Sequence, residues 1–163
     1  IGYLFIGKRI GTLLKHIKEP ILLAFSTSSS EAAFPRTLLE LERFGCPNKI
    51  TSFVLPLGYS FNLDGSMMYM TFASIFIAQS YGIPLDLPTQ FSMLLVLMLT
   101  SKGIAGVPRA SLVVIAGTLT SFNIPEAGLA LLLGIDPLLD MGRSATNVVG
   151  NSVATAVISK LEA

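Results

Sequence analysis

The chain has 163 residues, of which 52% are hydrophobic and only 13% are charged, and its net charge is +1. Soluble domains carry about 25% charged residues, so this composition and a mean hydropathy of +0.69 favour a membrane protein. The nearly neutral charge excludes a basic field for nucleic acid, and a single cysteine excludes an internal disulfide and a cysteine-rich metal site.

The first third of the chain alternates two apolar arms with a small polar segment. The arm LLKHIKEPILLAF leads into STSSSEAAFPR at residues 26–36, and TLLELERF follows. Short arms around a polar tip are typical of a re-entrant hairpin, whose tip is buried in protein or faces water. We therefore expect a first helical hairpin over residues 11–45.

The next apolar segment, residues 50–81, is interrupted by SFNLDGS. In a soluble protein Asn62, Asp64 and Gly65 would form a surface turn. Within a membrane segment the same residues predict a broken helix. Its unpaired carbonyls, the Asn62 amide and the Asp64 carboxylate are hard oxygen ligands suited to a small cation.

The arm–tip–arm pattern returns over residues 89–122. The runs FSMLLVLMLT and SLVVIAGTL would each reach about halfway across 30 Å of hydrocarbon, and SKGIAGVPRA lies between them. Pro35 and Pro108 both precede an arginine and are 73 residues apart, and Asp64 and Asp140 are 76 residues apart. These matches indicate an internal repeat of a hairpin followed by a functional helix.

The C-terminal segment, residues 127–161, contains a predicted helix from Asp136 to Leu161, with Asp136 as the capping residue and Pro137 in the first turn. At 100° per residue, six polar side chains fall within an arc of about 100°. They are Asp136, Asp140, Arg143, Ser144, Asn147 and Asn151. A soluble amphipathic helix could carry the same stripe, but the neighbouring segments are too apolar for that interpretation.

Asp140 and Arg143 are the ionisable residues in this stripe that most favour a ligand. They could neutralise each other at i, i+3 within a helix bundle. Alternatively, the Arg143 guanidinium could bind a ligand carboxylate while Asp140 holds a ligand ammonium, an arrangement that suits a zwitterion.

The motifs TSSSEAAFPRTL, GYSFNLDGS, SKGIAGVPRASLVV and GIDPLLDMGRSATNVVGNSVATAVISKLE resemble the dicarboxylate/amino acid:cation symporter family, which has the glutamate-transporter fold. The resemblance implies an all-α membrane protein in which residues 1–163 form the C-terminal transport core of an elevator-type carrier with inverted repeats. It also implies an absent N-terminal scaffold domain, a homotrimer, a multi-pass location in the cell membrane, and co-transported Na⁺ or H⁺ without a further cofactor.

The resemblance also assigns site residues. In the substrate site, Asp140 would bind the amino group, Arg143 the side-chain carboxylate and Asn147 the α-carboxylate. The supporting substrate contacts would be Ser29, Ser30, Ser66, Val107 and Ser144. The cation ligands would be Gly58, Ser60, Asn62, Asp64, Ser101, Lys102, Ile104, Asn147 and Asn151.

Two departures from the family pattern leave the substrate open. Leu63 stands where sodium-coupled amino acid carriers have a methionine, and Asn151 stands where they have an aspartate. The loss of the aspartate charge weakens one sodium site. The segments around both residues are similar to the C4-dicarboxylate branch of the family. Asp140 would repel a dicarboxylate without an amine, so we expect aspartate or glutamate, with a C4-dicarboxylate such as succinate as the alternative. A passive anion channel is a further alternative. An enzyme is not expected, because no GxSxG motif accompanies the single histidine, His16.

Overall fold

The structure is a computed structural model that describes residues 2–103 and 109–162. These residues form helices and connections without a strand, as the expected all-α class requires. In chain order the elements are α1 (Gly2–Ile6), α2 (Arg9–His16), α3 (Lys18–Thr27), α4 (Phe34–Phe44), α5 (Asn48–Phe61), α6 (Asp64–Ser80), α7 (Leu87–Thr100), η1 (Ser101–Gly103), α8 (Ala110–Ser121), η2 (Glu126–Leu129), α9 (Ala130–Leu133) and α10 (Asp136–Leu161).

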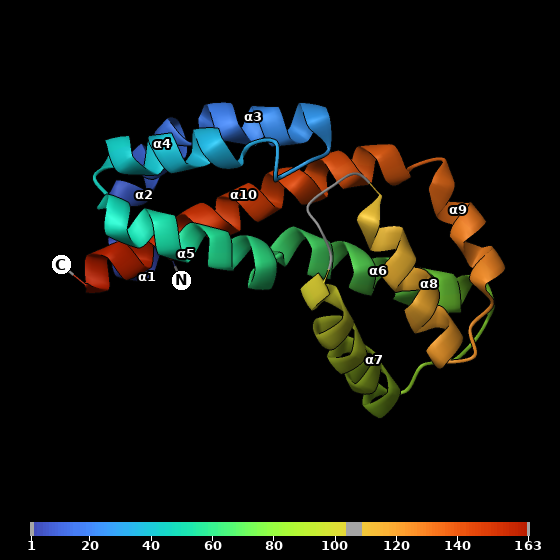
Figure 1. Cartoon of the computed structure of the whole chain (residues 1–163). Helices are drawn as coiled ribbons and strands as arrows, with labels where there is room; N and C mark the ends of the chain where they lie inside the picture. The colour runs from blue at the N-terminus through green and yellow to red at the C-terminus, as the bar shows by residue number, and fades with distance from the viewer. Residues whose placement is uncertain (1, 104–108, 163) are drawn as a thin grey trace.

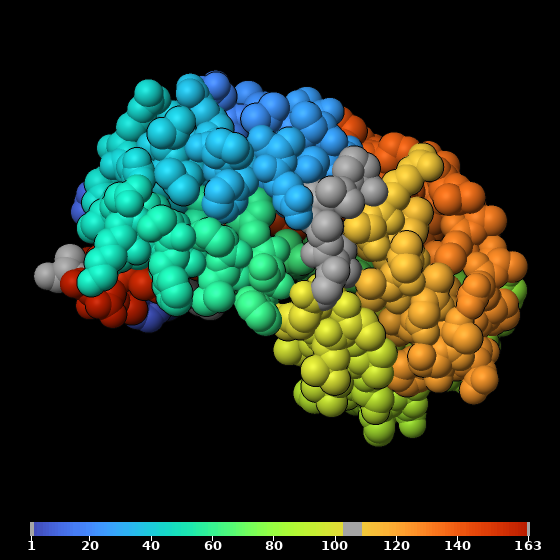
Figure 2. Space-filling model, in the orientation of Figure 1, coloured from blue at the N-terminus to red at the C-terminus, as the bar shows by residue number. Residues whose placement is uncertain are grey.

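Helices α1 to α5 pack along the C-terminal part of α10, and α6 to α9 gather at its N-terminal end (Figure 1). The first group encloses a core formed by Ile6, Leu13, Ile17, Leu41, Cys46, Leu55 and Ala156. In the space-filling view, α4 covers one end of the visible face, α8 and the orange segment that follows it cover the other end, and α7 projects at the bottom (Figure 2). The long helix α10 therefore joins the two halves of the molecule.

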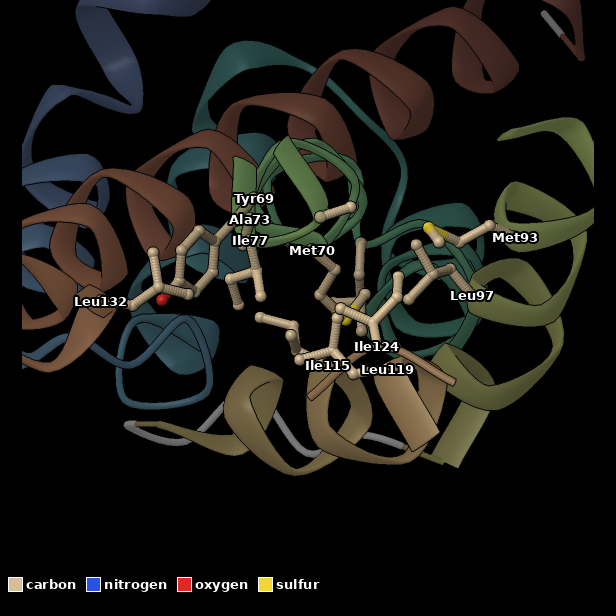
Figure 3. Close-up of a cluster of buried hydrophobic side chains, with 12 residues drawn as sticks. Tyr69, Met70, Ala73, Ile77, Met93, Leu97, Ile115, Leu119, Ile124 and Leu132 are labelled. Atoms are coloured by element: carbon tan, nitrogen blue, oxygen red, sulfur yellow. The ribbon is translucent and has the colours of Figure 1, made fainter. Parts of the chain in front are cut away.

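The second core lies between α6, α7 and α8. Met70 and Ile77 of α6 point toward Ile115 and Leu119 of α8, while Leu97 of α7 closes one side of the cluster (Figure 3). All five side chains are fully buried. This packing holds α6, which begins beside the polar stripe, against α8, which begins beside the second hairpin tip.

Local sequence signals set the helix ends. The first hairpin turns into α4 at Pro35, a favourable position in a first helical turn, and α4 ends at Gly45 with φ of 109°. Helix α7 begins after Asp86, whose carboxylate accepts a hydrogen bond from the Thr89 backbone N–H at 2.9 Å. The Thr89 hydroxyl and this backbone N–H hold the pKa of Asp86 below its ordinary value.

The predicted break in the middle of the chain is present. Helix α5 ends at Phe61 and α6 begins at Asp64, so only Asn62 and Leu63 separate the two helices. Helix α10 also runs from Asp136 to Leu161, as the sequence predicts. Among the described residues, no helix combines the length and the apolar character needed to cross a membrane.

Candidate functional site

The N-terminus of α6 is held against α10 by one side chain. The Asn147 Oδ1 atom accepts hydrogen bonds from the backbone N–H groups of Gly65 at 2.8 Å and Ser66 at 3.3 Å. Its Nδ2 atom donates to the Ser66 hydroxyl at 3.1 Å. Asn147 therefore satisfies first-turn donors that α6 cannot satisfy itself.

Gly65 allows the close approach of these two helices. A Cβ atom at this position would lie 2.2 Å from the backbone oxygen of Arg143. Any side chain larger than hydrogen would have to move one helix backbone away from the other.

Asp140 and Arg143 form a buried ion pair one turn before Asn147. The Arg143 Nε atom lies 2.6 Å from Asp140 Oδ1, and the two residues are only 3% and 1% exposed. Arg143 Nη1 also donates to the Ser66 hydroxyl at 3.2 Å. The mutual neutralisation that the sequence left open is therefore realised here, within a cluster of buried polar groups.

The interruption between α5 and α6 faces the polar side of α10, which also carries Asn147 and Asn151. The Asn62 Nδ2 atom donates to Asn151 Oδ1 at 3.1 Å, which joins two of the predicted cation ligands. Gly150 leaves room for Asp64, because a Cβ there would lie 2.1 Å from Asp64 Oδ2. Gly58 approaches Asn151 in the same way, with an ideal Cβ 2.6 Å from its Oδ1 atom.

Around the break between α5 and α6, the candidate ligand atoms are oxygens. They belong to amide side chains, to one carboxylate and to the backbone. Within residues 2–103 and 109–162 there is no group of three or more His, Cys, Asp or Glu side chains able to hold a metal ion. The donor set fits a hard cation such as Na⁺ better than a transition metal.

The first hairpin tip brings buried hydroxyls toward α10. Ala24 and Ala33, on either side of the tip, pack against Val148 of α10. Ser30 is fully buried, and its hydroxyl has no hydrogen-bond partner within residues 2–103 and 109–162; the same holds for Ser144 on α10. Ser29 accepts a hydrogen bond from the Ala32 N–H at 3.2 Å.

The remaining predicted ligands lie at the second tip and on α5. The Ser101 hydroxyl donates to the Met98 carbonyl, and Lys102 Nζ donates to the Phe61 carbonyl at 2.9 Å, which connects this tip to the end of α5. The exposed Ser60 hydroxyl donates to the Pro56 carbonyl, while the cation role predicted for this residue belongs to its backbone oxygen. Ile104 and Val107 lie outside the described residues.

Asp136 does not act as the helix cap that the sequence predicts, because α10 already includes it and its side chain turns toward α6. Its Oδ1 atom accepts a hydrogen bond from the Tyr69 hydroxyl at 2.5 Å. The Arg109 Nε atom lies 3.6 Å from its Oδ2 atom, and the Arg109 backbone N–H donates to Asp140 Oδ2 at 2.9 Å. The sequence assigned neither Tyr69 nor Arg109 to the site. Arg109 belongs to the Pro–Arg match between the two predicted tips, but that match gave it no ligand role, and no local motif marks Tyr69.

A groove of about 770 Å³ runs between α6, α9 and α10 and reaches Gly65 and Arg143 at its floor. Its walls are mostly apolar and include Phe72, Leu132 and Leu139. The buried ion pair therefore lies beside a hollow, although the lining does not favour a charged ligand there.

Comparison with known proteins gives the same family as the motifs. The model of the sodium:dicarboxylate symporter family matches residues 1–161. A proton/sodium-glutamate symport protein of Bacillus caldotenax is 55% identical over 156 residues, which are 96% of this chain and 37% of that protein. A proton/glutamate-aspartate symporter of Escherichia coli (strain K12) is 52% identical, with 96% and 36% covered.

A C4-dicarboxylate transport protein of Laribacter hongkongensis (strain HLHK9) is 49% identical over 159 residues, which are 97% of this chain and 36% of that protein. The chain thus spans little more than a third of the length of these relatives. Because the family model matches nearly every residue, the chain belongs to the sodium:dicarboxylate symporter family.

Proposed function

We propose that this chain is the transport core of a secondary carrier that moves an acidic amino acid together with Na⁺ or H⁺ across the cell membrane. The observation that carries the proposal is the buried cluster of Asp140, Arg143, Ser66 and Asn147 beside the interrupted helix. Ionisable groups in such an environment are expensive unless a partner completes their coordination. The glutamate and aspartate named for two relatives agree with this ligand class.

The chemistry of each residue defines its role. The planar guanidinium of Arg143 can exchange part of its contact with Asp140 for the side-chain carboxylate of the substrate. Asp140 then binds the substrate ammonium, and the Asn147 amide binds the α-carboxylate. Ser30 and Ser144, whose buried hydroxyls have no partner in the described part of the chain, are available to complete the hydrogen bonds of the ligand.

The co-transported cation would bind around the break between α5 and α6. Asn62, Asp64 and Asn151 would supply side-chain oxygens, and Gly58, where an ideal Cβ would lie 2.6 Å from Asn151 Oδ1, would supply a backbone oxygen. Ser101 and Lys102 would contribute carbonyl oxygens from the second tip. A small cation prefers such oxygen ligands.

Replacing Gly150 with alanine should weaken this cation site by about tenfold, the lower end of the effect of disturbing a ligand's surroundings. The new methyl group would occupy the position of Asp64 Oδ2, 2.1 Å away, and would push the carboxylate aside without moving a backbone. Aspartate uptake as a function of Na⁺ concentration, and separately of pH, measures the change. The matched control is Gly142→Ala, whose methyl group meets nothing within 4 Å. Cation dependence equal to that of the control would contradict the assignment of Asp64.

The lengths of the elements support a proposal for the membrane arrangement. Helix α3 has 10 residues and α7 has 14, which correspond to about 15 and 21 Å, roughly half to two thirds of the hydrocarbon thickness. We therefore propose that residues 11–45 and 89–122 are re-entrant hairpins, that 50–81 is the broken transmembrane helix and that 127–161 contains the last one. A scaffold domain elsewhere in the protein would trimerise and let this core slide as an elevator.

A C4-dicarboxylate is the second candidate substrate, and Asn151 favours it, because this residue lacks the charge expected in a sodium-coupled amino acid carrier. The C4-dicarboxylate transport protein of Laribacter hongkongensis is 49% identical to the chain. Asp140 argues for an amino acid, because its carboxylate attracts an ammonium and repels a dicarboxylate.

Asp140→Ser should shift the preference of the carrier toward succinate, because it removes the negative charge that binds the amine and keeps a small polar group. Competition of succinate against labelled aspartate in proteoliposomes gives the ratio of the two affinities. Coulomb attraction between unit charges about 4 Å apart is about 4 kcal/mol near a protein surface, so a change of tenfold or more is expected. Unchanged selectivity would remove the reason for choosing an amino acid.

Uptake by the full-length protein in liposomes tests the function itself. Na⁺ and H⁺ gradients are imposed separately, and aspartate is compared with succinate. A symporter saturates and concentrates its substrate above the outside level when either gradient is present. A passive channel would only equilibrate the anion, and this result would refute the proposal.

A further inference from the structure

Asp136 has an unusual environment for a carboxylate. The residue is 0% exposed, and it lies at the start of α10 between α6 and the beginning of α8. Its Oδ1 atom is bound by the Tyr69 hydroxyl, but its Oδ2 atom is buried without a hydrogen bond from any of the described residues. A buried carboxylate oxygen of this kind requires either a counter-charge or a proton.

Arg109 supplies the counter-charge from the outside. Its guanidinium Nε atom lies 3.6 Å from Asp136 Oδ2, while its side chain remains 63% exposed. The neighbouring charges on α10, Asp140 and Arg143, pair with each other, and among the described residues Arg109 is the cation that lies within ion-pair distance of Asp136. Helix α6 faces Asp136 with the neutral Tyr69, and α9 (Ala130–Leu133) has no ionisable side chain. Without Arg109 the buried group would therefore carry an uncompensated negative charge.

Arg109 also occupies the position beside Asp140 where the ligand ammonium is predicted to bind. The Arg109 backbone N–H donates to Asp140 Oδ2 at 2.9 Å, the oxygen on the side of Asp140 away from the Arg143 contact. A ligand ammonium would form a charge-assisted hydrogen bond there, roughly twice as strong as one from a neutral N–H. Arg109 also has a left-handed backbone with φ of 62°, a conformation that is strained for a residue with a side chain. This strain favours release of Arg109 once a ligand competes for Asp140.

We propose that binding of an amino acid at Asp140 displaces Arg109 from α10, and that Asp136 then takes up a proton in place of the guanidinium. The proton comes from the aqueous phase and forms an O–H bond at Asp136 Oδ2. It replaces the Arg109 guanidinium as the positive charge that compensates this carboxylate. The inference rests on the proposed function, since it requires an acidic amino acid at Asp140. Asp136 would be the carrier of the coupled proton, and Arg109 would be the positioning residue that excludes this proton until the substrate arrives.

Thermodynamic linkage makes the coupling reciprocal. If substrate binding takes up a proton, then protonation of Asp136 must strengthen substrate binding by the same factor. Affinity for aspartate would therefore rise as the pH falls, which is the behaviour required of a proton symporter. A dicarboxylate without an amine would not displace the Arg109 N–H in this way and would bind without proton uptake at Asp136.

Calorimetry of the purified full-length protein measures the number of protons taken up for each aspartate bound. Aspartate is titrated in buffers that differ in ionisation enthalpy, across neutral and mildly acidic pH, and the slope of heat against ionisation enthalpy gives the protons taken up per ligand. About one proton is expected for the unmodified protein, because a single group changes state. Asp136→Asn should bind aspartate with no proton uptake, since its amide keeps the Tyr69 contact but cannot ionise.

Arg109→Ala provides an independent variant with a change at an exposed side chain. Asp136 would then lack its counter-charge before binding and would already be protonated, so proton uptake should also fall to about zero while aspartate still binds. The matched control is Asp86→Asn at the start of α7, a carboxylate outside the site, and this variant should keep an uptake of about one proton.

The outcomes separate this inference from the function on which it rests. Aspartate binding by the unmodified protein without proton uptake would overturn the role of Asp136 and leave the carrier proposal intact. Uptake of a proton by the Asp136→Asn variant would assign the proton to another group and would also overturn it. If the unmodified protein bound no aspartate at all, the proposed function would fail, and this inference would fail with it.

Discussion

Arg143→Ala is expected to reduce aspartate uptake by at least about 100-fold. Removing one partner of a buried ion pair costs about 3–5 kcal/mol, because the remaining charge stays buried without compensation. Here the remaining charge is Asp140, which is 1% exposed, and Ser66 would lose the same guanidinium as a hydrogen-bond partner. Initial rates of labelled aspartate uptake into proteoliposomes, at equal amounts of inserted protein, provide the measurement.

Two further variants separate ligand binding from folding. Combining Arg143→Ala with Asp140→Asn removes both charges, so the thermal midpoint should recover while uptake remains absent. Arg43→Ala serves as the exposed control, because Arg43 lies at the end of α4 and is 60% exposed in its pair with Glu40. Normal aspartate affinity in the Arg143→Ala variant would show that the guanidinium does not bind the substrate.

Gly65→Ala should be the most destabilising small substitution in the described part of α6. The added methyl group would lie 2.2 Å from the Arg143 backbone oxygen and 2.9 Å from Thr146 Cβ. Since a backbone atom cannot turn away as a side chain can, α6 would have to retreat from α10, at a cost of about 3 kcal/mol or more. The Asn147 hydrogen bonds to the N-terminus of α6 would lengthen at the same time.

A thermal unfolding series in detergent tests this expectation. The control is again Gly142→Ala, which changes the same residue type inside a helix but meets open space. Alanine is the better helix former, so the control should be as stable as the unmodified protein or up to about 1 kcal/mol more stable. Equal midpoints for Gly65→Ala and Gly142→Ala would mean that the contact between α6 and α10 is looser than the structure indicates.

Local signals in the sequence identify the long helix and the interruption. Pro137 in the first turn and the 100° spacing of polar residues predict α10 from Asp136 to Leu161, and these are its observed ends. The prediction of a shared polar face is also confirmed, because Asn147 and Asn151 are both buried on it. The Asn62–Gly65 segment marks the break because it combines a turn-forming pair with flanking apolar runs.

The contacts that complete the site depend on residues far apart in the chain. Tyr69 and Asp136 are separated by 67 positions, and their hydrogen bond exists only because α6 lies along α10. A tyrosine in an apolar run gives no sign of such a partner, so the sequence leaves it as packing. The capping prediction for Asp136 was wrong for the same reason, since the tertiary contact competes with the local one. The substrate and cation roles themselves stay predictions.

The single helix α10 carries both Arg143 and Asn151, eight residues apart, which places the two positions about 12 Å apart along the axis. A carboxylate held at the first position and a cation held at the second would attract each other by about 1.4 kcal/mol at an effective dielectric constant of 20. The carboxylate and the cation would therefore each bind about tenfold more tightly in the presence of the other. Helix α10 would not have to bend or rotate to produce this effect. If the proposed substrate and cation bind there, part of the energetic link between them would come from electrostatics at a spacing fixed by helix geometry.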